Sequence, residues 1–145
     1  MSNFSVAPLT DMCDVLSGGT PKTSVGHYWD GEIPWASVKD FNINSRWFSS
    51  TEKRISLEGF NSCSSVLLEP GELIISARGT VGVIAQPRIQ TAFNQSNYGL
   101  KAKQGVADND YLYYALVHAN KALLGDTHGG TVSYTHLTLP TIYSV

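Results

Sequence analysis

The chain has 145 residues, of which 42% are hydrophobic and 15% are charged, and its formal net charge is -2. This length suits one domain with a sizeable core, and no apolar run is long enough for a membrane span. The net charge is slightly negative, so the chain as a whole lacks the basic character by which many proteins attract nucleic acid. Cys13 and Cys63 lack disulfide or zinc spacing, and the N-terminus lacks the pattern of a signal peptide. We therefore expect a cytoplasmic protein with reduced thiols.

The first predicted element is a helix that starts near Pro8, a residue favoured in the first helical turn. Apolar residues follow at helical spacing from Leu9 to Leu16, and Gly18-Gly19 should end the helix. The next stretch, GGTPKTSVGHYWDGEIPW (18–35), is rich in Gly, Pro, Ser and Thr, which predicts a loop.

The middle of the chain predicts many short strands. Pro70 and Gly71 occupy the central positions of a type II turn over Glu69–Glu72, which should separate two of these strands. We expect a helical turn over 56–60 and strands near 33–38, 46–48, 66–68, 73–77, 81–85, 90–93 and 98–102.

One clear helix follows the strands. Asp108 or Asn109 can cap its start, and Gly125 should end it. Its apolar stripe consists of Leu112, Ala115, Leu116, Ala119 and Leu123. This order of elements predicts an α+β fold, a single compact domain with a β-rich middle of short strands and flanking helices.

The last residues, Ser133–Val145, have a different character. The stretch SYTHLTLPTIYSV contains no Asp, Glu, Lys or Arg, and it fits no cap, hairpin or helix of the domain. It could add an edge strand, but we expect a segment that is foreign to the domain. The predicted organisation is therefore a domain over 1–132 and an atypical tail over 133–145.

The segment 73–107 contains four cations and no acid, although the whole chain is slightly acidic. Such a segment can form a surface for a polyanion, or it can arise by chance. Within it, the predicted hairpin tip Arg78-Gly79-Thr80 carries a long cation and a hydroxyl where a turn alone would need only the glycine. Arg78 could reach a ligand or pair with a carboxylate of the domain itself.

Two further polar segments are candidates for binding. The loop after Gly18-Gly19 differs from the order G-x-x-x-x-G-K-[ST] of a nucleotide-binding loop, but it could hold a nucleic-acid phosphate or simply form a surface turn. Asn and Gln amides can pair bidentately with adenine, although an Asn-rich turn is the simpler interpretation of the second segment alone. The candidate residues are Thr20, Lys22, Thr23 and Ser24 in the first segment and Asn94, Gln95, Ser96 and Asn97 in the second. The aromatics expected in the core or holding loops are Trp29, Trp35 and Trp47.

No pattern of catalytic or metal-binding residues stands out. The four histidines are scattered, and no G-x-S-x-G elbow is present. The acidic pairs Asp30/Glu32 and Glu69/Glu72 flank turns, where acids are usually solvated. We expect no active site, no metal site and no cofactor.

Five motifs follow one another along the chain: GGTPKTSVGHYWDGEIPWASVKD, LLEPGELIISARGTVGVIAQ, AFNQSNYGLKAK, YLYYAL and GGTV. Together they resemble the target-recognition domain of the specificity (S) subunit of type I restriction-modification systems, over roughly Val6 to Val132. The resemblance implies that double-stranded DNA is a partner. It adds Lys39 and Lys101, from the first and third motifs, to the candidate contacts.

In that family the domain recognises half of a bipartite DNA target. Helical spacers of the S subunit hold methyltransferase (M) subunits, and these bind S-adenosylmethionine. The M subunits in turn connect the S subunit to the restriction (R) subunit. The S subunit itself is not catalytic. The resemblance implies that Arg78 and Thr80 approach the DNA backbone and that 94–97 reads bases. The chain departs from the family in having one such domain, with 133–145 where a spacer would follow GGTV. The alternative is a β-rich carbohydrate- or protein-binding module.

Overall fold

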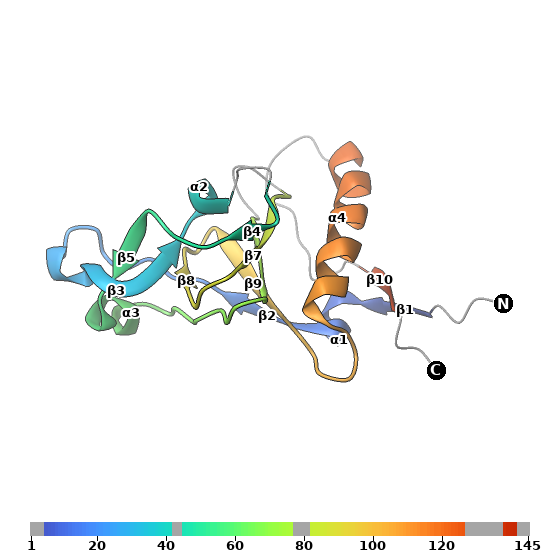
Figure 1. Cartoon of the computed structure of the whole chain (residues 1–145), viewed down its shortest axis with the longest axis horizontal. Helices are drawn as coiled ribbons and strands as arrows, with labels where there is room; N and C mark the ends of the chain where they lie inside the picture. The colour runs from blue at the N-terminus through green and yellow to red at the C-terminus, as the bar shows by residue number, and fades with distance from the viewer. Residues whose placement is uncertain (1–4, 42–44, 77–81, 127–137, 142–145) are drawn as a thin grey trace.

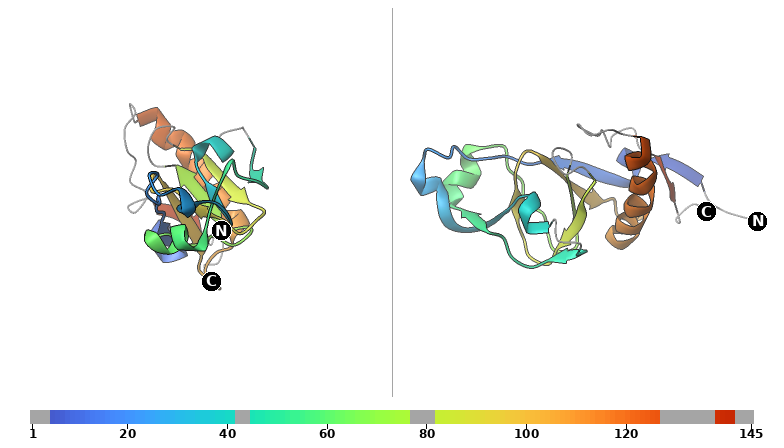
Figure 2. Two further views of the ribbon diagram at one scale, coloured as in Figure 1. Left: turned by 90° about the vertical axis from the view of Figure 1, so that its left-hand side faces the viewer. Right: turned by 90° about the horizontal axis from the view of Figure 1, so that it is seen from above.

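The computed structural model of the chain describes residues 5–41, 45–76, 82–126 and 138–141. Figure 1 shows an elongated molecule, with small strands and helices at one end and the long helix at the other. Figure 2 shows the same arrangement from two further sides.

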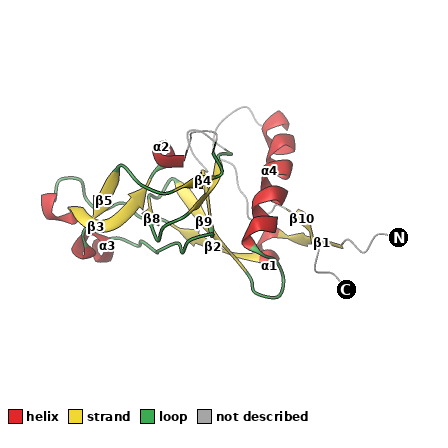
Figure 3. Ribbon diagram, in the orientation of Figure 1, coloured by secondary structure: helices red, strands yellow, loops and turns green. Residues whose placement is uncertain are grey.

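Short strands and short helices are interspersed as far as α3, and four consecutive strands then precede the long helix near the C-terminus (Figure 3). The elements are β1 (Ser5–Pro8), α1 (Leu9–Met12), β2 (Cys13–Ser17), the 3-10 turn η1 (Gly26–Tyr28), β3 (Trp29–Ala36), α2 (Val38–Phe41), β4 (Trp47–Phe48), β5 (Lys53–Ile55), α3 (Leu57–Ser62), β6 (Leu73–Ser76), β7 (Ile84–Pro87), β8 (Ala92–Phe93), β9 (Asn97–Ala102), α4 (Asn109–Asp126) and β10 (Thr138–Thr141).

The strands form a five-stranded sheet in the order β2-β9-β6-β7-β4 and a three-stranded sheet in the order β5-β3-β8. Most pairs are antiparallel, but β4–β7 and β3–β8 are parallel. The predicted α+β class is therefore confirmed. No helix of the described residues combines the length and the hydrophobicity that a membrane span requires.

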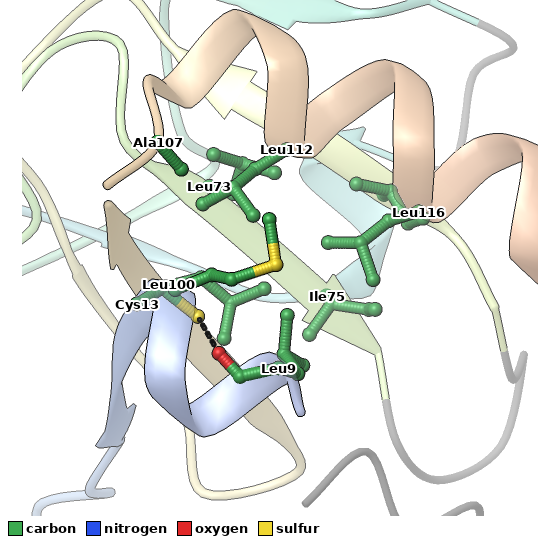
Figure 4. Close-up of a cluster of buried hydrophobic side chains, with 10 residues drawn as sticks. Leu9, Cys13, Leu73, Ile75, Leu100, Ala107, Leu112 and Leu116 are labelled. Atoms are coloured by element: carbon green, nitrogen blue, oxygen red, sulfur yellow. Dashed lines mark hydrogen bonds between the residues drawn. The ribbon is translucent and has the colours of Figure 1, made fainter. Parts of the chain in front are cut away.

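Both faces of β6 are buried, because successive side chains of a strand point to opposite sides. Leu73 and Ile75 pack in a cluster beneath α4 together with Leu112 and Leu116, as Figure 4 shows. Ile74 belongs to a second cluster on the other side. The apolar stripe of the long helix is thus confirmed at Leu112 and Leu116, while Leu123 lies outside the side chains that the structure describes.

The predicted helix from Leu9 to Leu16 is wrong beyond its first turn. Only Leu9–Met12 is helical, and Cys13–Ser17 pairs with β9 in the five-stranded sheet. Hydrogen bonds and apolar contacts with β9 outweigh the local helical spacing, which is a weak guide over so short a segment. The Cys13 thiol donates to the carbonyl of Leu9 at 3.4 Å, and burial raises its pKa to about 12, so it is held as an unreactive thiol.

Two local predictions are confirmed, and one is wrong. Gly71 has a φ of 90°, and the N–H of Glu72 donates to the carbonyl of Glu69 at 3.1 Å, as a type II turn requires. Ser56 caps the short helix α3 by accepting from the N–H of Gly59. In place of the expected strand 66–68, only an isolated bridge between Leu68 and Thr91 forms.

We predict that Asp108→Ala lowers the free energy of unfolding by about 1 kcal/mol. Asp108 is the residue before α4, and its Oδ1 accepts from the N–H of Tyr111 at 2.6 Å; Asn109 instead accepts from Ala102 in β9. Urea denaturation measures the change. The matched control is Gln104→Ala, an exposed residue of the same connection, which should stay within about 0.5 kcal/mol of the wild type. If both variants lost the same free energy of unfolding, Asp108 would not stabilise α4 as a cap.

The segment 133–145 contains β10, which pairs antiparallel with β1. This pairing corresponds to the alternative in which the segment adds an edge strand. The predicted domain boundary at residue 132 stays a prediction.

Candidate nucleic-acid interface

Three of the polar segments leave the five-stranded sheet at the same edge. Ser17, at the end of β2, lies opposite Tyr98 near the start of β9. Ser76, at the end of β6, lies opposite Asn97, and β7 begins beside it. We call this edge, where β2 and β6 end and β7 and β9 begin, the loop edge. The start of segment 18–24, the turn 94–97 and the ends of the 76–82 connection therefore lie together, although they are far apart in the sequence. The rest of the first loop leads on to β3, where the carbonyl of Lys22 accepts from Trp29.

Arg78, Gly79 and Thr80 lie outside the described residues. The residues on either side of them, Ser76 and Gly82, are joined by a hydrogen bond of 3.4 Å between the Gly82 N–H and the Ser76 carbonyl.

The glycine pair of the first loop contacts the second polar segment directly. The N–H of Gly19 donates to the carbonyl of Phe93 at 3.1 Å, and a Cβ at Gly18 would lie 2.3 Å from the carbonyl oxygen of Asn94. Only glycine allows this close approach of two backbones. In Figure 1 the chain leaving β2 runs past β8 toward the end of the molecule that β3, β5 and α3 form.

The end of β3 adds a third segment to this contact. The N–H of Asn94 donates to the carbonyl of Ala36 at 3.1 Å, so Ser37 and α2 follow directly beside the loop edge. Lys39 of α2 is exposed. The Asp40 carboxylate already has hydrogen-bond partners within the domain, because it accepts from the backbone N–H groups of Ser37 and Glu52 at 2.8 Å each.

Two tryptophans hold the first loop in place. Trp35 is buried and donates from Nε1 to the carbonyl of Gly19 at 3.0 Å. Trp29 donates to the carbonyl of Lys22 at 3.2 Å, and its ring meets that of Trp35 edge to face at 5.1 Å. The expectation that these tryptophans hold loops is confirmed for both.

The candidate side chains differ in their freedom to bind. Lys22 and Lys39 are exposed and form no ion pair with any residue that the structure describes. The other exposed candidates are Thr23, Ser24 and Gln95; Thr20, Asn94 and Ser96 are half-buried, and Asn97 is buried. Exposed cations, hydroxyls and amides are the groups that suit contacts with phosphate groups and base edges.

Lys101 lies apart from the other candidates. It is exposed on β9, four residues beyond Asn97, or roughly 13 Å along the strand. Its Nζ lies 3.9 Å from a carboxylate oxygen of Glu72, and Asp14 is its partner across the β2–β9 pair. The segment 73–107, basic in sequence, is therefore not one basic patch among the described residues.

Sequence reasoning missed a cluster around Arg46, where β4, β7 and α4 meet. The Arg46 guanidinium donates to Gln86 at 2.5 Å, Asp110 at 2.6 Å and Tyr114 at 3.0 Å. It also lies 4.7 to 4.9 Å from the ring centroids of Trp47, Tyr113 and Tyr114. Arg88 stacks on the Trp47 ring at 4.7 Å. No short-range signal could have predicted the cluster, because Arg46 and Asp110 are 64 residues apart.

A shallow cavity of about 280 Å³ lies beside the first loop, next to Trp29. Its charged lining residues are Asp30, Glu52, Lys53 and Arg54, and Thr23 completes the wall. Two acids and two bases balance, so the cavity adds no net positive surface. No group of metal-ligating side chains occurs among the residues that the structure describes.

Comparison with known sequences points to one family. The family model described as type I restriction modification DNA specificity domain matches residues 1–143. The chain is 29% identical over 131 residues to the type I restriction enzyme MjaIX specificity subunit of Methanocaldococcus jannaschii, and 29% identical over 105 residues to the EcoprrI specificity subunit of Escherichia coli. These stretches are 89% and 70% of this chain, but only 30% and 25% of the two relatives.

Comparison with solved structures agrees in fold. A chain from a study of complex assembly and conformational transition of the type I R-M system matches with a TM-score of 0.73 at 16% identity, over 97% of this chain and 34% of that one. The HsdS subunit of Thermoanaerobacter tengcongensis matches with a TM-score of 0.69 at 18% identity, over 96% and 33%. The type I S subunit of M. genitalium gives a TM-score of 0.60 at 13% identity, over 95% and 34%.

Proposed function

Because the chain belongs to the type I restriction modification DNA specificity domain family, we propose that its loop edge binds double-stranded DNA and recognises one half of a bipartite target. The observation that carries this proposal is the convergence of the polar segments. The Gly18-Gly19 start of the first loop, the end of β3 that leads into α2, and the turn 94–97 come from distant parts of the chain and meet at one edge. A DNA duplex requires such a continuous surface, because phosphates and bases must be contacted together.

We propose two kinds of contact at the loop edge. Lys22 and Lys39 would contact phosphates, together with the hydroxyls of the first loop, at Thr20, Thr23 and Ser24. Asn94 and Gln95 would contact base edges. Arg78, Gly79 and Thr80 stay candidates for the same surface, since Ser76 and Gly82 on either side of them belong to the loop edge. Lys101 is left out, because it pairs with Glu72 away from this edge.

The partner proteins are also a proposal. A whole S subunit would bring this domain together with methyltransferase subunits, and through them with the restriction subunit, in the cytoplasm where the DNA lies. S-adenosylmethionine would bind to the methyltransferase subunits, and the present chain would contribute recognition without catalysis. The chain covers about a third or less of the relatives that it matches, so these contacts involve the whole subunit.

We predict that Lys22→Gln and Lys39→Gln each weaken binding to all duplexes alike. A lost phosphate contact should reduce the slope of log affinity against log salt by about one unit. A mobility-shift series from low to moderate salt, on duplexes of random and of selected sequence, measures this slope.

Lys101→Gln is the matched control, since it removes the same charge from the same domain outside the loop edge. It should change the slope by much less than either loop-edge variant. Equal slopes for all three variants would mean that only net charge matters, which would contradict the proposed surface. If the wild type binds no duplex at any salt concentration, the proposed function itself is wrong.

A further inference from the structure

The turn 94–97 contains amides that differ in burial. Asn97 is only 2% exposed, Asn94 is half-buried, and Gln95 is exposed. Asn97 therefore cannot contact a base itself, while the other two can.

Two hydrogen bonds link Asn97 to Asn94. The amide Nδ2 of Asn97 donates to Oδ1 of Asn94, and the backbone N–H of Asn97 donates to the carbonyl of Asn94 at 3.3 Å. On its other side, Asn94 donates its N–H to Ala36. Both the backbone and the side chain of Asn94 are thus fixed in direction. The remaining amide atom of Asn94, Nδ2, donates to no described residue.

The burial of Asn97 indicates that its side chain has a specific task. Its Oδ1 is buried and accepts no hydrogen bond from any residue that the structure describes. A buried polar atom without a partner is costly, and an apolar side chain in this place would avoid that cost. The hydrogen bond from Asn97 to Asn94 is the benefit that the asparagine provides.

We infer that Asn97 is a positioning residue that orients the Asn94 amide, so that Asn94 offers hydrogen-bond donors to an acceptor on a base edge. The bidentate pair with adenine uses both the amide oxygen and the amide nitrogen, whereas the oxygen of Asn94 is shared with Asn97, which leaves one of its two lone pairs, and Nδ2 keeps both of its hydrogens. Acceptors that suit the free Nδ2 are O6 and N7 of guanine, N7 of adenine and O4 of thymine. Gln95 forms no hydrogen bond with a described residue, so it keeps both groups for adenine. This inference rests on the proposed function.

The test compares base preferences rather than affinities alone. Duplexes bound by the full chain are selected from a random pool and sequenced, for the wild type and for four variants. Asn97→Ala removes the orienting donor. Asn94→Asp keeps an acceptor for Asn97 but presents a carboxylate in place of the amino group. Gln95→Ala, in the same turn, and Gln104→Ala, at an exposed position in the connection before α4, serve as controls. Thermal melting of each variant shows whether it is folded.

We expect Asn97→Ala to reduce discrimination at one base position by about 2- to 10-fold, the value of one hydrogen bond. Asn94→Asp should change the preferred base at that same position toward cytosine, whose N4 amino group donates. Gln95→Ala should affect a different position, and Gln104→Ala should affect none.

The inference is overturned if folded Asn97→Ala keeps the wild-type preference at every position, or if Asn94→Asp changes a position that Asn97→Ala does not. If Asn97→Ala unfolds, Asn94→Asp alone decides, because its expected shift toward cytosine requires the donor-presenting orientation. Selection of no duplex by the wild type would instead overturn the proposed function on which the inference rests.

Discussion

Gly18→Ala is expected to lower the free energy of unfolding by about 2–4 kcal/mol, which is large for the addition of one methyl group. The new Cβ would lie 2.3 Å from the Asn94 carbonyl oxygen, 2.5 Å from that of Phe93 and 2.6 Å from the Phe93 ring. Backbone atoms cannot move aside as a flexible side chain can, so the first loop and the turn 94–97 must separate. Urea denaturation measures the loss, and duplex binding should fall with it.

The control for this variant is Gly26→Ala. Gly26 is exposed in the same loop region, and a Cβ there would meet no atom within 4 Å. We expect its stability to stay within about 0.5 kcal/mol of the wild type. If Gly18→Ala is as stable as Gly26→Ala, the contact between the two loop-edge segments does not exist in solution.

The sequence predicted the fold well where a residue type determines its local conformation. The turn at Pro70-Gly71 and the cap at Asp108 follow from the turn preference of Pro-Gly and from the capping preference of aspartate. It failed at Cys13–Ser17, where the strand depends on pairing with β9, and no local pattern in the sequence reports such a partner. For the same reason, the observed first and last residues of several short strands differ from the predicted ones.

Arg46→Ala is expected to destabilise the domain by about 2–4 kcal/mol. Most of this loss should not come from the ion pair with Asp110, because the Asp110 side chain is 71% exposed and surface pairs contribute little. Most of it should come from Gln86, which is 0% exposed and whose Oε1 accepts from Arg46; removing the donor leaves a buried acceptor unsatisfied. Stacking with three aromatic rings is lost as well.

Two variants test this account of Arg46. Arg46→Lys keeps the charge but loses the planar group that reaches several partners, so it should recover only a small part of the loss. Arg88→Ala removes a neighbouring exposed arginine that also stacks on Trp47, and it should cost about 1 kcal/mol or less. Denaturation midpoints for the three variants are compared with the wild type. Similar losses for Arg46→Ala and Arg88→Ala would mean that stacking, and not the contact with Gln86, accounts for the effect.

The candidate site was predictable as a list of residues but not as a surface. Residue types alone marked Lys22 and the turn 94–97, because cations and amides are the groups that contact phosphates and bases. They could not separate Gln95, which is exposed, from Asn97, which is buried, nor show that Lys101 lies beside Glu72, apart from the turn 94–97. Those distinctions depend on strand register, and a shift of one residue would reverse them.

The pairing of β2 with β9 has a consequence for synthesis of the protein. The first strand of the five-stranded sheet pairs with a strand made near the end of the domain, so ribosomal synthesis must pass Ala102 before the sheet can close. Sheets joined by such distant contacts fold slowly, because a long loop must be ordered before the pairing forms. Until then β2 and β6 expose unpaired edges, and an incomplete nascent chain has not yet assembled the loop edge.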